Sequence, residues 1–154
     1  MKLICTNRKT FDLSDNGEKL GQLNYDGFFT FRCQAAVGND QYEIRPKGVF
    51  GTSMQVSRDG KEVASLQMNW KGNIIVSYQN GEEFVLKATG IFMNSYVLED
   101  KNQQKILLLK PDFDWAKFSY HYDISHDQRP KDLLLVLLAA YSANYFIAAM
   151  SAAV

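Results

Sequence analysis

The last 22 residues of the chain limit its possible folds more than any other feature. Residues 133–154 carry no charged side chain, and more than half of them are leucine or alanine, which are strong helix formers. Pro130 suits the first turn of a helix and Asp132 the positive end of its dipole, so the sequence predicts a helix over residues 130–154. The 22 uncharged residues of such a helix would span about 33 Å. Because this segment is apolar on every side, it must lie in a lipid bilayer or inside a protein.

A membrane span is the first of these two environments. The segment is long enough and sufficiently free of charge to cross a bilayer, and Arg129 and Lys131 precede it as a cytosolic flank would. The insertion energy of its large apolar residues sums to only a few kcal/mol, and Tyr141, Ser142 and Asn144 oppose insertion. A tail-anchored membrane protein is therefore one interpretation of the segment, and a buried central helix is the other.

The preceding residues, 1–125, have the pattern of antiparallel strands. Apolar and polar residues alternate along four stretches: 64–70, 74–79, 84–88 and 118–124. This alternation places one face of each strand on a core and the other in water. Three dipeptides are of the kind that favours two-residue hairpins: Asp26-Gly27, Asp59-Gly60 and Asn80-Gly81. Short strands with turn signals about every ten residues indicate an up-and-down meander or barrel.

These signals predict a mainly β fold: a closed antiparallel barrel of about twelve strands that encloses the hydrophobic C-terminal helix. The strands are expected near residues 2–6, 9–13, 18–25, 28–36, 41–46, 49–57, 61–70, 73–79, 82–89, 91–98, 104–110 and 115–124. A barrel of more than about eight strands has a lumen too wide for side chains alone to fill. A helix is about 10–12 Å across, so it can fill that lumen. The strand count therefore favours the buried helix over the membrane span.

A buried helix has two consequences for its own side chains. We expect five of them to be shielded from water: Leu135, Leu138, Ala139, Ser142 and Phe146. The polar residues Tyr141, Asn144 and Tyr145 should form hydrogen bonds with the barrel wall, because an unpaired polar group in a core is costly.

Composition and charge are those of a globular protein with a single domain over residues 1–154. Hydrophobic residues make up 46% of the chain and charged residues 22%. Lysine plus arginine (17) equals aspartate plus glutamate (17), and a net charge of zero argues against a nucleic-acid binder. Two cysteines, Cys5 and Cys33, are too few for a disulfide-dense scaffold, and residues 1–8 lack a signal-peptide core. We therefore expect a cytoplasmic protein whose reduced cysteines pack as small hydrophobic side chains.

The layout and two stretches of the sequence resemble a known superfamily. In residues 54–66 a strand ends in a short charged turn and restarts with Val63-Ala64, and residues 132–138 lead into the apolar helix. In these features the chain resembles the tubby C-terminal-like superfamily, which includes the LURP-one-related proteins and the phospholipid scramblases. The resemblance implies a closed barrel of about twelve strands threaded by a hydrophobic C-terminal helix. The chain lacks a Pro-rich scramblase N-terminus, a cysteine cluster and an obvious calcium loop, so it is more similar to a minimal, domain-only relative.

One histidine motif has the residue types of a metal site. His121, Asp123, His126 and Asp127 form the pattern His-x-Asp-x-x-His-Asp, in which His121 and Asp123 would share one face of a strand. His126 lies beyond the end of that strand. We therefore interpret the motif as the polar outer face of a strand rather than as a metal site.

Support for catalysis is weak elsewhere in the sequence. Asp112 and Asp114 could form a pair of carboxylates for acid–base work, but they follow Pro111 in a predicted loop and are interpreted as solvated charges. The sequence contains no phosphate-binding glycine loop, nucleophile elbow or Cys-x-x-Cys motif. We therefore expect neither an enzyme nor a cofactor or metal site.

Four basic residues are the candidate ligand-binding residues. Arg45 and Lys47 flank Pro46, and Arg58 and Lys61 flank the predicted Asp59-Gly60 turn. Better-known members of the tubby-like superfamily bind phosphoinositides through cationic residues on the barrel, so the resemblance implies an acidic-headgroup site at these four positions. Each Lys or Arg near an anionic membrane contributes about 1 kcal/mol. The competing interpretation is dispersed surface charge that nearby acids balance.

These observations predict a non-enzymatic binding module. The expected ligand is an acidic phospholipid headgroup or a similar anionic molecule, bound weakly at the periphery of a membrane without transmembrane insertion. A structural or protein–protein interaction domain is the alternative function, together with the tail-anchored protein described above.

Overall fold

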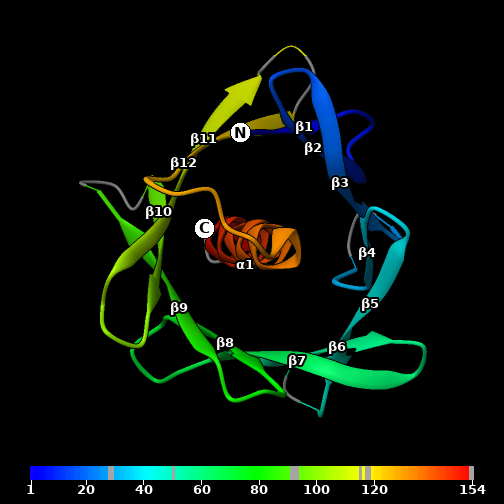
Figure 1. Cartoon of the computed structure of the whole chain (residues 1–154), viewed down its shortest axis with the longest axis vertical. Helices are drawn as coiled ribbons and strands as arrows, with labels where there is room; N and C mark the ends of the chain where they lie inside the picture. The colour runs from blue at the N-terminus through cyan, green and yellow to red at the C-terminus, as the bar shows by residue number, and fades with distance from the viewer. Residues whose placement is uncertain (28–29, 50, 91–93, 115, 117–118, 153–154) are drawn as a thin grey trace.

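Twelve antiparallel strands close into a barrel around one helix, which confirms the predicted fold class (Figure 1). The computed structural model describes residues 1–27, 30–49, 51–90, 94–114, 116 and 119–152. Within these residues the elements are β1 (Lys2–Cys5), β2 (Thr10–Asp15), β3 (Glu18–Tyr25), β4 (Cys33–Val37), β5 (Asp40–Lys47), β6 (Ser53–Arg58), β7 (Lys61–Met68), β8 (Ile74–Tyr78), β9 (Glu83–Thr89), β10 (Ser95–Asp100), β11 (Lys105–Asp114), β12 (Ser119–Ser125) and α1 (Leu133–Ala152). Each strand pairs with its neighbours in the chain, and β1 pairs with β12 to close the ring.

Alternation along the strands builds the inner wall of the barrel. Every strand contributes at least one side chain that is no more than 2% exposed. One such residue per strand, from β1 to β12, is Leu3, Leu13, Leu23, Ala35, Ile44, Val56, Leu66, Val76, Leu86, Leu98, Leu109 and Tyr122. The register keeps these residues on one side, since partners across the ladder point the same way.

Helix α1 fills the lumen that this wall encloses (Figure 1). All five side chains expected to be shielded from water are at most 8% exposed, which confirms the prediction: Leu135, Leu138, Ala139, Ser142 and Phe146. The helix comes close to the wall at Gly21 of β3. A Cβ atom there would lie 3.2 Å from the Leu137 Cδ1 atom and 2.8 Å from the Ala36 carbonyl oxygen. A glycine at this position therefore avoids a clash with the backbone of β4 and also leaves room for Leu137 of the helix.

The helix begins slightly later than the sequence predicts. Its first residue is Leu133, so Pro130 lies before the helix and not in its first turn. Asp132 is the N-cap residue, because its carboxylate accepts a hydrogen bond of 3.0 Å from the Leu134 N–H. The other oxygen of the same carboxylate accepts a bond of 2.7 Å from the Tyr78 hydroxyl, which ties the start of α1 to the end of β8.

Four predicted strands include described residues that precede the corresponding strands, namely 30–32, 49, 51–52, 94 and 116. The strands predicted at 28–36, 49–57, 91–98 and 115–124 include residues outside the described ranges. The corresponding strands begin at residues 33, 53, 95 and 119. The predicted two-residue hairpin at Asp26-Gly27 is wrong, because these residues start a linker over 26–32. Asn16-Gly17, with φ of 49° and 83°, forms a tight turn that the sequence reading missed, whereas the predicted turn at Asp59-Gly60 is confirmed.

The stretch over 111–114 is part of β11, and the predicted loop there is wrong. Pro111 pairs in register with Tyr122 of β12, and the pairing of β11 with β10 ends at Leu109. The proline therefore lies on an edge where no second ladder needs its missing N–H. Asp112 and Asp114 consequently belong to an extended strand.

The two ends of the barrel differ. We call one the turn end: it contains the linkers 16–17, 38–39, 59–60, 79–82, 101–104 and 126–132, and α1 starts there. We call the other the loop end: it contains the linkers 6–9, 26–32, 48–52, 69–73, 90–94 and 115–118, and α1 finishes there. Antiparallel order assigns every linker to one of these ends, because consecutive strands run in opposite directions.

The buried position of the helix predicts that a tryptophan will destabilise the fold at a buried position of the helix but not at an exposed one. Ala143 is fully buried, so Ala143→Trp should overpack the lumen and destabilise the fold by at least about 1–3 kcal/mol. The melting temperature, followed by circular dichroism, should fall by several degrees. Ala149→Trp is the matched control, because Ala149 is exposed on the same helix. Equal melting of Ala143→Trp and the wild type would contradict the central position of the helix.

Candidate functional site

The four predicted basic residues lie in two separate places. Arg58 and Lys61 are register partners at the turn end, whereas Lys47 pairs with Ser53 at the opposite end of β6. Five residues along a strand correspond to about 17 Å, so Lys47 and Arg58 do not lie at one site. The structure therefore keeps Arg45 and Lys47 near one another and Arg58 and Lys61 near one another, but it does not bring all four residues to one site.

Three of these cations already have carboxylate partners. Arg45 forms an ion pair of 2.5 Å with Glu43, Lys47 one of 3.6 Å with Glu62, and Arg58 one of 2.6 Å with Asp40. The side chains of all three cations are about half exposed, so each pair contributes little to stability. An anionic ligand at these positions would compete with the carboxylates. The headgroup site at the four residues stays a prediction.

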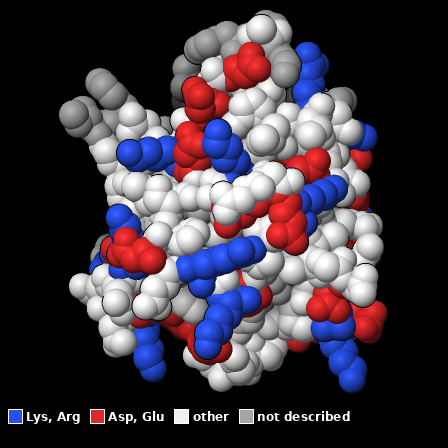
Figure 2. Space-filling model, turned by 45° about the horizontal axis from the view of Figure 1, so that its top comes forward, with Lys and Arg blue, Asp and Glu red and all other residues white. Residues whose placement is uncertain are grey.

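The outer wall carries charges of both signs. Figure 2 shows Lys and Arg side chains interspersed with Asp and Glu on the face it presents, without one large cationic area. In that mixed wall, Asp12 accepts a hydrogen bond of 2.7 Å from the Gln22 amide and forms an ion pair of 3.1 Å with Lys19. This arrangement agrees with the equal numbers of acidic and basic residues in the chain.

The histidine motif lies on the polar side of β12. The His121 Nδ1 atom accepts a hydrogen bond of 3.2 Å from the Cys5 N–H, and His121 pairs in register with Asp112 of β11. Asp123 is exposed. In the part of the chain that the structure describes, no three His, Cys, Asp or Glu side chains are close enough to hold a metal ion.

The most exposed apolar side chains lie at the loop end. Val49 is 94% exposed and Trp70 is 90% exposed, and both belong to loop-end linkers. Among the described residues, the other large hydrophobic side chains that are exposed lie on segments finishing at the same end: Ile4, Phe113 and Met150. We call Val49 and Trp70, together with the flanking Lys47 and Lys71, the loop-end patch.

The fold holds the two linkers of this patch side by side. The Met68 N–H donates a hydrogen bond of 3.0 Å to the Thr52 carbonyl oxygen, which joins linker 48–52 to the start of linker 69–73. Within the second linker, the Asn69 side chain accepts bonds of 3.0 Å from the N–H groups of both Lys71 and Asn73. This Asx turn presents the Trp70 ring to solvent, with the Lys71 Nζ atom 5.4 Å from the ring centroid.

The linkers at the loop end are also more apolar and more basic in sequence than the linkers at the turn end. The loop-end linkers contain eleven large apolar residues, five basic residues and one acidic residue. The turn-end linkers contain no large apolar residue, with three basic and four acidic residues. The predicted strands obscure this contrast, because they include many of the apolar linker residues. The signal was available in their position beside Gly and Asn, which favour turns.

A polar cluster ties the helix to the barrel wall near the loop end. The Asn144 Oδ1 atom accepts hydrogen bonds from the hydroxyls of Tyr120 (2.9 Å) and Tyr122 (2.8 Å), and its amide donates one of 2.9 Å to the Tyr25 oxygen. The Tyr141 hydroxyl donates to the Phe31 carbonyl at 2.7 Å, and the Tyr145 hydroxyl donates to the Gly51 carbonyl at 3.1 Å. These bonds confirm that the three polar helix residues find partners on the barrel.

Burial makes the acidic groups of the interior weak acids. Desolvation is the main cause that raises the pKa of Tyr25, Tyr120 and Tyr122 above the ordinary tyrosine value. Desolvation also raises the pKa of the thiols of Cys5 and Cys33, so both stay protonated at neutral pH. Both cysteines are free and buried, which confirms that they pack as small hydrophobic side chains.

Comparison of the chain with models of protein families, with curated proteins and with solved structures found no match.

The tyrosine cluster predicts loss of stability in alkali. The pKa of each tyrosine is higher in the folded than in the unfolded chain, where it is about 10. The unfolded state therefore releases more protons, and stability is complete below about pH 10 and falls as pH rises above it. Melting curves across this range, read by circular dichroism and by tyrosinate absorbance, should show ionisation together with unfolding. Ionisation of most tyrosines in a chain with native circular dichroism would contradict this coupling.

Proposed function

We propose that the protein is a non-enzymatic binding module that docks its loop end on an acidic phospholipid surface. The observation that carries the proposal is Trp70, 90% exposed, with the Lys71 ammonium over its ring, on a linker that a backbone hydrogen bond joins to the segment of the almost fully exposed Val49. Tryptophan favours the boundary between lipid and water, because its ring is apolar and its N–H is polar. Lysines beside it attract anionic headgroups.

The energies involved are those of weak, reversible binding. Transfer of one large apolar side chain out of water contributes about 1.5–3 kcal/mol, and each cation near an anionic surface contributes about 1 kcal/mol. Val49 and Trp70 supply the first contribution. Lys71 supplies the second, and Lys47 adds to it only where a headgroup displaces Glu62, which lies 3.6 Å from the Lys47 Nζ atom. Loss of translational and rotational freedom opposes both contributions.

The resemblance to the tubby-like superfamily supports the same class of ligand. Its better-known members bind phosphoinositides, which are acidic lipids. In this chain the patch that favours a lipid surface is at the loop end, whereas Arg58 and Lys61 lie at the turn end. If lipid binds at the loop end, the lysines there should contribute to binding. If it binds at the turn end, Arg58 and Lys61 should contribute instead.

Docking is distinct from spanning the bilayer. Residues 133–150 of α1 have a mean hydropathy of 1.9 and are long and apolar enough to cross a membrane, but 67% of them are buried inside the protein. The helix residues already pack against the barrel wall, and Asn144 is bonded to three of its tyrosines. We therefore propose surface binding with the helix retained in the lumen.

Vesicle co-sedimentation tests the proposal. The protein should sediment with vesicles of phosphatidylcholine mixed with phosphatidylserine more than with phosphatidylcholine alone, and less as salt is raised. Trp70→Ala should weaken binding about tenfold or more, because it removes the largest apolar contact. Lys47→Gln combined with Lys71→Gln should weaken binding to the acidic vesicles.

The matched control removes two charges from the other end of the barrel. Arg58→Gln combined with Lys61→Gln changes the net charge as much as the lysine pair does, and it should leave binding nearly unchanged. If this control variant loses binding while Trp70→Ala retains it, the headgroup site lies at the turn end and the loop-end proposal is wrong. If no vesicle binds at low salt, membrane binding is refuted altogether.

A further inference from the structure

A pocket of about 260 Å³ lies at the loop end, between the barrel wall and the last turns of α1. It lies beside the linkers 6–9 and 26–32 and reaches the buried Asn144. A larger hollow of about 510 Å³ exists at the turn end, lined by the strand ends of β1, β2 and β12 and by Asn16 and Gly17, with no aromatic ring among its lining residues. The loop-end pocket differs because it combines ring faces, a cation and buried polar groups.

Aromatic rings form much of the wall of this pocket. Phe11, Tyr25, Phe31 and Tyr120 line it. The ring centroid of Phe11 is 6.1 Å from that of Tyr25 and 5.6 Å from that of Tyr120, so the rings form a connected apolar surface. Such a surface favours a flat ring that can stack or contact edge to face.

Two polar donors of the pocket have no acceptor within the part of the chain that the structure describes. Ser119 is 6% exposed and lines the pocket, and its hydroxyl has no hydrogen-bond partner among the described residues. The Tyr25 oxygen accepts its bond from Asn144, which leaves the Tyr25 hydroxyl proton available to an acceptor. Buried donors of this kind are normally paired, so an acceptor group belongs near them. Since burial raises the pKa of Tyr25, it remains a neutral donor at neutral pH.

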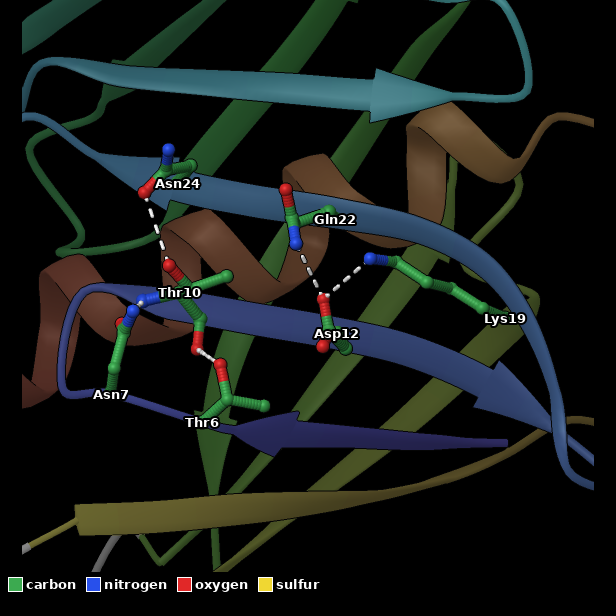
Figure 3. A network of polar contacts seen from close by, with 7 residues as sticks. All are labelled: Thr6, Asn7, Thr10, Asp12, Lys19, Gln22 and Asn24. Carbon is green, nitrogen blue, oxygen red and sulfur yellow. Dashed lines mark hydrogen bonds and ion pairs between the residues drawn. The ribbon is translucent and has the colours of Figure 1, made fainter.

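One cation stands at the edge of the pocket. Arg8 lines it, is exposed, and forms no ion pair in the ranges that the structure describes. Its backbone has a φ of 68°, which is uncommon for a residue with a side chain. The loop is held in this shape by the Asn7 side chain, which accepts hydrogen bonds from the N–H groups of Lys9 (3.2 Å) and Thr10 (2.9 Å). Figure 3 shows Asn7, Thr6 and Thr10 joined at this turn.

We infer that this pocket binds a small aromatic carboxylate, with its ring between the aromatic walls and its carboxylate toward Arg8 and the hydroxyl of Ser119. A guanidinium group matches a carboxylate in shape and charge, and hydroxyl donors complete its hydrogen bonds. The volume is just below the usual range for drug-sized ligands, so a single ring is the appropriate size. The inference does not depend on membrane docking, because the pocket's aromatic and polar lining is separate from Val49 and Trp70.

Calorimetric titration in lipid-free buffer at low salt tests the inference with benzoate as the probe. Benzoate should bind saturably, while benzyl alcohol, which lacks the charge, and acetate, which lacks the ring, should bind at least tenfold more weakly. Arg8→Gln should weaken benzoate binding at least tenfold, and Arg8→Lys should restore part of it. Lys101→Gln, the same charge loss at the turn end, should leave the affinity unchanged.

Ser119→Ala separates a ligand-binding role from a packing role. This variant removes a hydroxyl that has no hydrogen-bond partner among the described residues, so its melting temperature should not fall, whereas its affinity for benzoate should fall several-fold. Two results would overturn the inference: no saturable binding of benzoate to the folded wild type, or an affinity that neither Arg8→Gln nor Ser119→Ala changes. Equal binding of benzyl alcohol and benzoate would overturn the assignment of a carboxylate.

Discussion

The fold depends on the mutual burial of one helix and one barrel. Twelve strands enclose a lumen that side chains of the wall alone cannot fill, and α1 has no polar face that water could solvate. The helix therefore fills the lumen of the barrel, and the barrel shields the apolar helix from water. The contact is also specific, because Asn144 on the helix is bonded to tyrosines of β3 and β12. Satisfied polar groups in a core fix the rotation and depth of the helix within the barrel.

This arrangement makes the two ends of the molecule unlike. The chain closes the turn end with short polar turns and with the bond between Tyr78 and Asp132 at the start of the helix. At the loop end the linkers are longer and more apolar, and the helix finishes among them. The polar cluster, the aromatic pocket and the exposed Val49 and Trp70 therefore lie toward the same end. Both proposed binding activities follow from this difference between the ends rather than from the outer wall.

Net charge alone conceals this difference. The chain is neutral overall, and its outer wall mixes both signs, as the face in Figure 2 shows. The basic excess of the loop-end linkers is balanced elsewhere on the barrel. A neutral protein can thus present a locally cationic end, and short-range attraction to an anionic ligand depends on that local charge because salt screens the rest within about 10 Å.

Local sequence patterns were enough to predict about twelve antiparallel strands, the apolar helix and the core-facing positions along most strands. These properties follow from local periodicity and from the absence of charge over residues 133–154, which neighbours far away in the chain do not alter. Which residues meet across long separations in the chain depends on the closed barrel. It placed Pro111 inside β11, brought Tyr25 to Asn144, and left Trp70 exposed although the sequence reading put it in a strand. Alternation predicts which face of its own strand a side chain lies on. The closure of the barrel determines which strand ends become neighbours and which apolar residues remain exposed.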